Sequence, residues 1–96
     1  MMVLVTYDVE TTTSSGRSRL RRVSKECLNF GQRVQNSVFE CVVNESQLLI
    51  LESRIGSIIN AESDSVRFYR LGKGYESKIT VLGKVTSYSV NEPLII

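Results

Sequence analysis

Residues 3–9 read Val-Leu-Val-Thr-Tyr-Asp-Val, and the fold begins with this stretch. The residues alternate, with Val, Val, Tyr and Val on one side and Leu, Thr and Asp on the other. A period of two is typical of a strand whose two faces meet different surroundings. Residues 11–16 follow directly and are small, polar and turn-prone. Asp8 therefore lies where the predicted strand gives way to a loop.

A helix is predicted over residues 17–30. Ser14 or Ser15 is in position to cap its start, and Gly31 stands where a left-handed cap is expected at its end. The apolar residues recur at the spacing of one helix face: Leu20, Val23, Cys27 and Phe30.

Residues 33–43 are rich in β-branched side chains, and we interpret them as one long strand. Asn44 and Gln47 then form a capping-box pattern that opens a second helix. The apolar face of this second helix consists of Leu48, Leu51, Ile55, Ile58 and Ile59.

Two further strands are predicted at residues 65–71 and 78–82, on either side of a Gly-Lys-Gly turn at residues 72–74. That glycine pair lacks the spacing of a phosphate-binding P-loop. We interpret the elements together as βαββαβ, an α+β ferredoxin-like fold in which two helices cover one face of an antiparallel sheet. In such a fold no helix packs on the other face of the sheet, so another part of the protein must cover it.

The length of 96 residues indicates a single domain over residues 1–96. No apolar run exceeds the five residues Met1 to Val5, and acidic residues stand where a signal peptide would be apolar, so we expect a cytoplasmic protein with no membrane partner. A core this small gains from an added interface, which favours dimerisation. The apolar segment 84–96 is expected either to add a fifth strand to the partner's sheet or to pack on its own subunit.

The sequence contains no histidine, which excludes nucleophilic catalysis by Ser/His or Cys/His pairs. Cys27 and Cys41 have no metal-binding spacing and are predicted to be small core residues. If the protein hydrolyses a substrate, a metal ion must therefore activate the water.

Basic residues gather on the first predicted helix and just beyond it. Six of the twelve lysines and arginines fall between positions 17 and 33, against the single acid Glu26. Such a face binds a polyanion through phosphate contacts, with an affinity that falls as salt rises. The alternative is a solvated helix face. The six are Arg17, Arg19, Arg21, Arg22, Lys25 and Arg33.

Asp8 is the candidate metal ligand. A carboxylate at the end of a strand, beside a loop and a basic helix, suits Mg²⁺ or Mn²⁺ when phosphate and water complete the coordination. Glu10 lies two residues on, and a symmetric dimer could bring two Asp8 side chains to one ion. The alternative is an aspartate that only caps a turn.

Three stretches together resemble the small CRISPR-associated adaptation proteins, the second of the two core Cas adaptation families. They are Val-Thr-Tyr-Asp-Val at 5–9, Gly-Gln-Arg-Val-Gln-Asn-Ser-Val-Phe-Glu at 31–40, and Val-Arg-Phe-Tyr-Arg-Leu-Gly at 66–72. The resemblance implies a ferredoxin-like homodimer in which Asp8 of each subunit faces the dimer cleft and binds a divalent ion. It also implies that the protein is a metal-dependent endonuclease for double-stranded DNA or single-stranded RNA.

The same resemblance assigns further residues. Arg19, Arg22 and Arg33 would bind the nucleic-acid backbone, with Arg17 and Arg21 as neighbouring candidates, while Tyr7, Ser37 and Phe39 would shape the cleft. It also implies a different kind of function, in which the dimer bridges the larger CRISPR adaptation integrase as a scaffold that holds incoming DNA. A ferredoxin-like small-molecule sensor is a third possibility, but no glycine-rich ligand loop supports it.

Overall fold

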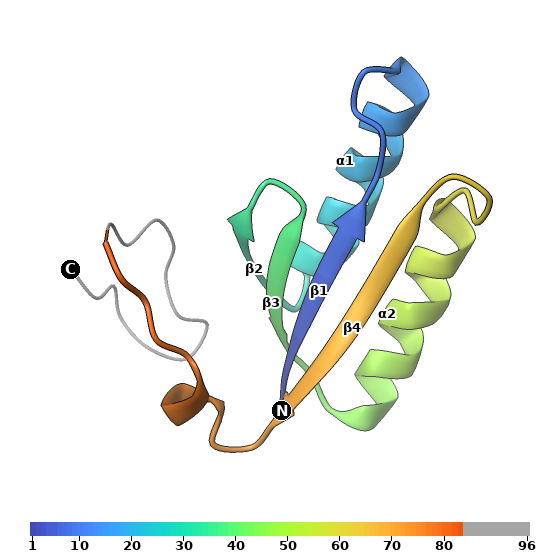
Figure 1. Cartoon of the computed structure of the whole chain (residues 1–96). Helices are drawn as coiled ribbons and strands as arrows, with labels where there is room; N and C mark the ends of the chain where they lie inside the picture. The colour runs from blue at the N-terminus through green and yellow to red at the C-terminus, as the bar shows by residue number, and fades with distance from the viewer. Residues whose placement is uncertain (84–96) are drawn as a thin grey trace.

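A computed structural model describes residues 1–83 of the chain. Its order of main elements is β-α-β-β-α-β, and the four strands form one antiparallel sheet in the order β2-β3-β1-β4 (Figure 1). This arrangement confirms the predicted α+β, ferredoxin-like fold. The elements are β1 (Met2–Asp8), α1 (Ser14–Leu28), β2 (Gly31–Gln35), β3 (Val38–Val42), α2 (Glu45–Ile58) and β4 (Ser65–Gly72), followed by a short 3-10 helix, η1 (Tyr75–Lys78).

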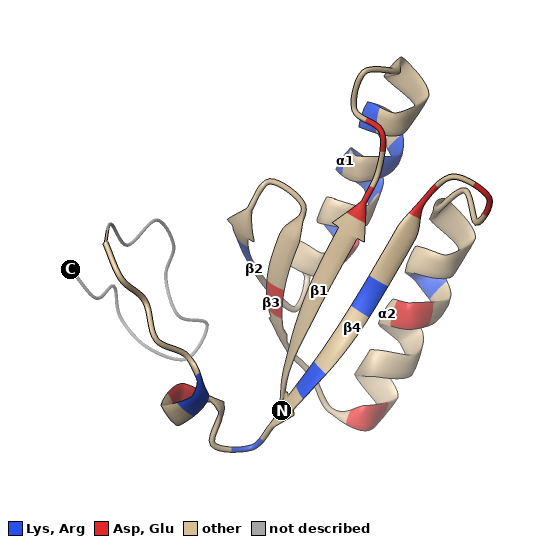
Figure 2. Ribbon diagram, in the orientation of Figure 1, with Lys and Arg blue, Asp and Glu red and all other residues tan. Residues whose placement is uncertain are grey.

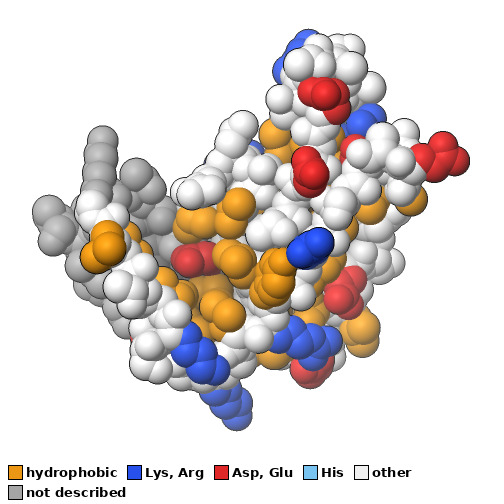
Figure 3. All heavy atoms as spheres, viewed as in Figure 1, with side chains coloured by type: hydrophobic (Ala, Val, Ile, Leu, Met, Phe, Trp, Pro, Cys, Tyr) orange, Lys and Arg blue, Asp and Glu red, His pale blue; other side chains and the backbone are white. Residues whose placement is uncertain are grey.

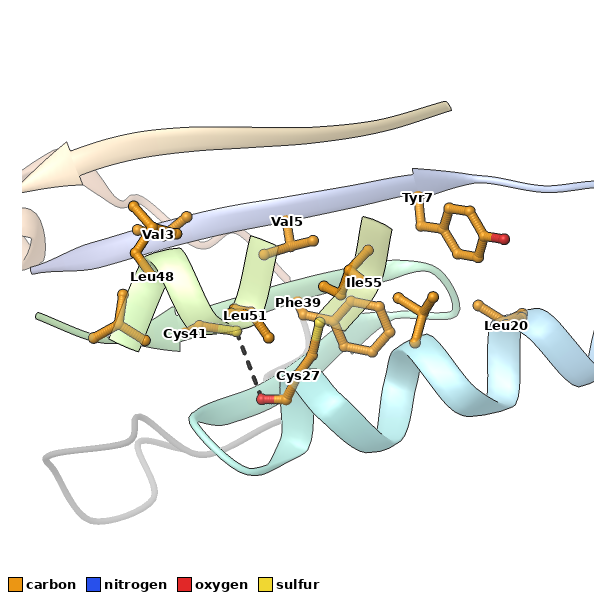
Figure 4. Close-up of a cluster of buried hydrophobic side chains, with 12 residues drawn as sticks. Val3, Val5, Tyr7, Leu20, Cys27, Phe39, Cys41, Leu48, Leu51 and Ile55 are labelled. Atoms are coloured by element: carbon orange, nitrogen blue, oxygen red, sulfur yellow. Dashed lines mark hydrogen bonds between the residues drawn. The ribbon is translucent and has the colours of Figure 1, made fainter. Parts of the chain in front are cut away.

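Both helices pack on the same face of the sheet (Figure 1). The alternation in β1 decides which side chains enter the core: Val3, Val5 and Tyr7 are at most 2% exposed and point toward the helices (Figure 4). Helical spacing and the alternation of β3 bring the rest of the core to this side. The core is completed by Leu20, Val23, Cys27, Phe39, Cys41, Val43, Leu48, Leu51 and Ile55.

Within residues 1–83, no helix covers the opposite face of the sheet. Leu4, Val38 and Val42 remain only half-buried there, and Tyr69 is 43% exposed. Hydrophobic side chains therefore gather on the surface in front of the sheet (Figure 3). Among residues 1–83, no helix has both the length and the apolar character that crossing a bilayer requires.

The ends of α1 differ from the prediction. The helix begins at Ser14, and Thr13 rather than Ser14 or Ser15 caps it, because the Thr13 hydroxyl accepts a hydrogen bond from the Gly16 N–H at 3.0 Å. At the other end Asn29 is the cap, in a right-handed conformation.

Gly31 is not the left-handed cap that we predicted; it is the first residue of β2. A Cβ atom on Gly31 would lie 1.8 Å from the carbonyl oxygen of Glu40. The glycine is therefore needed for the close approach of two strands and not for a positive φ.

The single long strand predicted over residues 33–43 is wrong. The structure divides this region into β2 and β3, with a turn at Asn36 and Ser37 between them. The two strands pair with each other as a hairpin, with Arg33 opposite Phe39. The ranges predicted from the sequence run β-α-β-α-β-β, and only this division of residues 33–43 produces the βαββαβ order that we assigned to them.

The strand predicted over residues 78–82 is also wrong. After β4 the chain turns at Gly72 and Gly74, which both have positive φ, and forms η1, and residues 79–83 pair with no strand among those described. The chain does turn at 72–74 as predicted, but the turn leads into η1 and not into a further strand. The expected fifth strand at 84–96 lies outside the described residues. The capping box that opens α2 is confirmed, with reciprocal hydrogen bonds of 2.8 and 2.9 Å.

Candidate functional site

Asp8 is the last residue of β1, and its side chain is exposed on the face of the sheet that lacks helices. The alternation of the strand puts Leu4, Thr6 and Asp8 on this face, and Asp8 lies opposite Ser65 of β4. Among residues 1–83 the Asp8 carboxylate has neither a hydrogen-bond donor nor a cation as a partner. It is therefore available to a ligand.

An open hollow of about 340 Å³ lies beside this carboxylate. The Tyr7 N–H donates a hydrogen bond of 2.9 Å to the carbonyl of Ser37, which fixes the β2–β3 turn against the end of β1. The hollow therefore gathers one carboxylate, one guanidinium and three aliphatic hydroxyls from two strands, β1 and β4, and the β2–β3 turn. Its lining consists of Thr6, Tyr7, Asp8, Ser37, Val38, Ser65, Arg67 and Tyr69.

A polar cluster lies on the helix side of the sheet, at the same end of β1. The Tyr7 hydroxyl donates to Asp64 at 2.5 Å, and the Arg19 guanidinium binds the same carboxylate with hydrogen bonds of 2.8 and 3.2 Å. The Asn60 N–H adds a hydrogen bond of 3.0 Å. These contacts fasten α1 and β1 to the loop that precedes β4.

The cluster changes the acidity of two of its members. Burial and the hydrogen bond to Asp64 raise the pKa of Tyr7 to about 12, so the phenol stays neutral. Burial alone would raise the pKa of Asp64, but the hydrogen bonds from Arg19, Tyr7 and Asn60 outweigh it and hold that pKa well below its usual range. Asp64 is therefore an ionised partner that occupies the Arg19 side chain.

A second hollow, of about 530 Å³, lies between α1 and the start of the hairpin. Arg33 reaches into it from β2, donates a hydrogen bond to the Ser24 hydroxyl, and lies 5.3 Å from the centre of the Phe39 ring. We call this hollow the basic groove, because four cations line it against two leucines. Its lining consists of Arg17, Leu20, Arg21, Ser24, Lys25, Leu28, Asn29 and Arg33.

The structure separates the predicted nucleic-acid-binding arginines. Arg17 and Arg33 share the basic groove, whereas Arg19 is bound to Asp64 and Arg22 is exposed on α1 outside both hollows. Figure 2 shows basic positions in blue along α1 and a further one on β2. None of the four lines the hollow that contains Asp8.

The three residues expected to shape the cleft also lie in different surroundings. Ser37 lines the hollow with Asp8. Tyr7 borders it, but its side chain is 2% exposed and bonds to Asp64 on the helix side. Phe39 is fully buried in the core, where its ring supports Arg33.

Two residues near Asp8 were missed by sequence analysis, Asp64 and Arg67. Asp64 sits in a polar loop and resembles any solvated acid there, so no local signal indicates its role. Arg67 alternates with apolar residues in a strand, and only the pairing of β4 with β1 shows that it faces the same hollow as Asp8.

The donor atoms near Asp8 fit a hard divalent cation only in part. No three acidic or cysteine side chains cluster among residues 1–83. Glu10 folds back on its own loop, where its Oε1 accepts a hydrogen bond from the Thr12 N–H at 3.1 Å. Mg²⁺ needs only one or two carboxylates when water and phosphate fill its other positions. Residues 1–83 of one chain thus supply one carboxylate to such a site.

Comparison with known proteins places these features in one family. The model of the family described as CRISPR associated protein Cas2 matches residues 1–79. The CRISPR-associated endonuclease Cas2 of Halalkalibacterium halodurans is 50% identical over 95 residues, which is 99% of each chain. The CRISPR-associated endoribonuclease Cas2 1 of Moorella thermoacetica is 45% identical over 96 residues and covers 100% of both. A crystal structure of Streptococcus pyogenes Cas2 at pH 6.5 superposes with a TM-score of 0.81 at 53% identity, over 86% of this chain and 100% of that one.

Proposed function

The chain belongs to the Cas2 family of CRISPR-associated proteins, and on that basis we propose that it is a metal-dependent endonuclease acting in spacer acquisition. Its substrate would be double-stranded DNA, single-stranded RNA, or both. Relatives at 50% and 45% identity carry the names endonuclease and endoribonuclease. The observation that carries the proposal is the exposed, unpaired Asp8 carboxylate beside an open polar hollow.

Asp8 would hold the ion, Mg²⁺ or Mn²⁺. A divalent ion at a carboxylate supplies Lewis-acid chemistry, lowering the pKa of water and offsetting the charge of a phosphate. In hydrolysis the oxygen of a water molecule bonds to phosphorus as the bond to one bridging oxygen breaks. Because the chain has no histidine, the attacking water would give up its proton to solvent and the departing oxygen would take one from solvent.

The active form would be a homodimer joined through the face of the sheet that lacks helices. That face exposes apolar side chains in its middle, among them Leu4, Val42 and Tyr69, and carries Asp8 at its edge. In a two-fold dimer the same patch lies on both sides of the interface, so both Asp8 side chains would border it. A second carboxylate would complete the partial ligand set that one chain supplies.

The basic groove would bind the nucleic-acid backbone outside the cleavage site. Arg17 and Arg33 would contribute most, together with the exposed Arg22. Arg19 would contribute less, because a phosphate must compete with Asp64 for its guanidinium. Ser37 would shape the cleft directly, whereas Tyr7 and Phe39 would do so from the core.

An alternative function is a non-catalytic scaffold that holds DNA for the CRISPR adaptation integrase. One observation favours it: the basic groove and the Asp8 hollow have no lining residue in common. Backbone binding could therefore persist without any metal chemistry at Asp8.

The deciding experiment is a cleavage assay with labelled duplex DNA and single-stranded RNA, in Mg²⁺, in Mn²⁺ and in chelator. Asp8→Asn removes the charge with little change of shape, and Glu62→Gln does the same to an exposed acid on the loop before β4. We expect wild type and Glu62→Gln to cut only with metal, and Asp8→Asn not to cut. Equal activity of Asp8→Asn and wild type would rule out the nuclease proposal, and retained salt-sensitive DNA binding would then favour the scaffold.

A further inference from the structure

We propose that Arg67 is the residue that binds the phosphodiester at the Asp8 site. This inference rests on the proposed nuclease function, because it assigns a role within the same site. The family resemblance and the charge of the first helix point to arginines of α1 and to Arg33 of β2 for phosphate contacts. The structure instead places a different guanidinium, from β4, beside Asp8.

The pairing of β4 with β1 fixes this placement. Arg67 lies opposite Thr6, and Ser65 lies opposite Asp8. Since side chains two apart on a strand share a face, Asp8 and Arg67 are diagonal neighbours on the uncovered side of the sheet. Diagonal neighbours in an antiparallel pair are about 7–8 Å apart, which leaves room for a phosphate group between them. The hollow lined by both residues is that space.

The Arg67 guanidinium is available to a ligand. Its NH1 group donates to the Tyr69 hydroxyl at 3.1 Å, which holds the side chain along the sheet. No carboxylate within residues 1–83 pairs with it. Arg70, three residues further along β4, differs in this respect, because Glu45 at the start of α2 neutralises it with hydrogen bonds of 2.8 and 3.0 Å.

The chemistry of the hollow matches a phosphodiester. A guanidinium offers a planar fork of N–H donors that suits two phosphate oxygens, and the hydroxyls of Ser37 and Ser65 can donate to others. A cation there would also offset the negative charge that grows on those oxygens during hydrolysis. The arginines of α1 cannot fill this role from the positions they occupy, because none lines the hollow.

Binding can be tested without cleavage. The probe is the dinucleotide thymidylyl-thymidine, which contains one phosphodiester, titrated in chelator while backbone amide signals are followed by NMR. In wild type we expect signals from Thr6, Ser37 and Ser65 to shift. Arg67→Ala should weaken binding about 10-fold or more, and Arg67→Lys should keep part of it. Arg70→Ala is the matched control and should bind as wild type does.

Cleavage gives the second measurement. Arg67→Ala should lower kcat roughly 100-fold, the usual effect of removing one donor to developing charge. The metal concentration for half-maximal activity should stay unchanged, whereas Asp8→Asn should abolish metal-dependent cutting. Sedimentation of each variant shows whether its assembly has changed.

The two proposals fail in different ways. If Asp8→Asn cuts like wild type, the nuclease proposal fails, and dinucleotide binding still decides the role of Arg67. If Asp8→Asn is inactive but Arg67→Ala binds and cuts as well as Arg70→Ala, the role of Arg67 is overturned and the nuclease stands. Arg67→Ala can also be tested at a protein concentration high enough to restore the dimer. If it then binds the dinucleotide as tightly as wild type, the role of Arg67 in phosphodiester binding is overturned, because the residue would act only in dimer formation.

Discussion

The Nε atom of Arg19 donates a hydrogen bond to Oδ2 of Asp64 at 2.8 Å, joining the first helix to the residue that precedes β4. The Asp64 side chain is fully buried, and the Tyr7 hydroxyl bonds to the same oxygen. Because Tyr7 precedes Asp8 and Ser65 follows Asp64, this contact fixes the two strand ends that form the floor of the hollow. The Arg19–Asp64 ion pair on the helix side of the sheet therefore helps to position the Asp8 hollow on the opposite face.

Replacing Asp64 should change how stability depends on pH. The pKa of Asp64 is lowered in the folded protein, so its stabilising contribution is complete above the ordinary carboxyl pKa of about 4 and is lost as the pH falls below that value. Asp64→Asn should lower Tm at pH 7 by roughly 5–10 °C and flatten the decline of Tm between about pH 4 and pH 2. Thermal unfolding followed by circular dichroism measures both effects. Glu62→Gln should keep the wild-type profile, and an equally steep decline in Asp64→Asn would contradict this account.

The two thiols should be unreactive in the folded protein. Cys27 and Cys41 are fully buried, and the Cys41 thiol donates to the Cys27 carbonyl at 3.6 Å (Figure 4). The neighbouring Cys41 thiol and burial together raise the pKa of Cys27, which disfavours its reactive thiolate. Reaction with Ellman's reagent at pH 8 should therefore wait for unfolding, whereas an added thiol in Leu82→Cys, at a position 89% exposed, should react at once. Prompt reaction of both native cysteines would contradict the packing described.

Much of the fold could be predicted because single residues carry clear signals. The alternation of β1 and the helical spacing of Leu20, Val23 and Cys27 each predict the buried face that the structure shows. The Asn44–Gln47 capping box marks the start of α2 to the residue. Asp8 could be singled out because the end of a strand and the start of a polar loop coincide there.

The errors occur where one residue type has two uses. Gly31 permits both a left-handed cap and a close approach of strands, and only the position of Glu40 across the hairpin decides between them. The Asn36–Ser37 turn is flanked by strand-forming residues on both sides, so the sequence pattern does not distinguish the hairpin from one long strand. Arg67 was missed because its place beside Asp8 depends on the pairing register between segments nearly 60 positions apart.

A charged side chain introduced in the middle of the sheet face that lacks helices should dissociate the proposed dimer. Leu4 is half-buried on β1, between Glu40 of β3 and Tyr69 of β4. In Leu4→Glu a second copy would have to bury an unpaired carboxylate, so sedimentation equilibrium should show a monomer at concentrations where wild type is dimeric. Leu49→Glu changes a leucine that is 64% exposed on α2 and should leave the dimer intact. A Leu4→Glu dimer as tight as wild type would place the interface elsewhere.

Salt dependence should show which arginines contact the nucleic-acid backbone. Each phosphate contact in duplex DNA adds about 0.9 to the slope of log affinity against log salt. Arg17→Gln and Arg33→Gln should each reduce that slope by about one contact, measured by fluorescence anisotropy with a duplex in chelator, because both side chains line the basic groove. Arg54→Gln, an exposed change on α2 where Glu26 is the partner, should leave the slope unchanged. Arg19→Gln should lower Tm and leave the salt slope nearly unchanged, because the Arg19 guanidinium is bound to Asp64. If the slope instead falls by one full contact, DNA must displace Asp64 from Arg19 on binding.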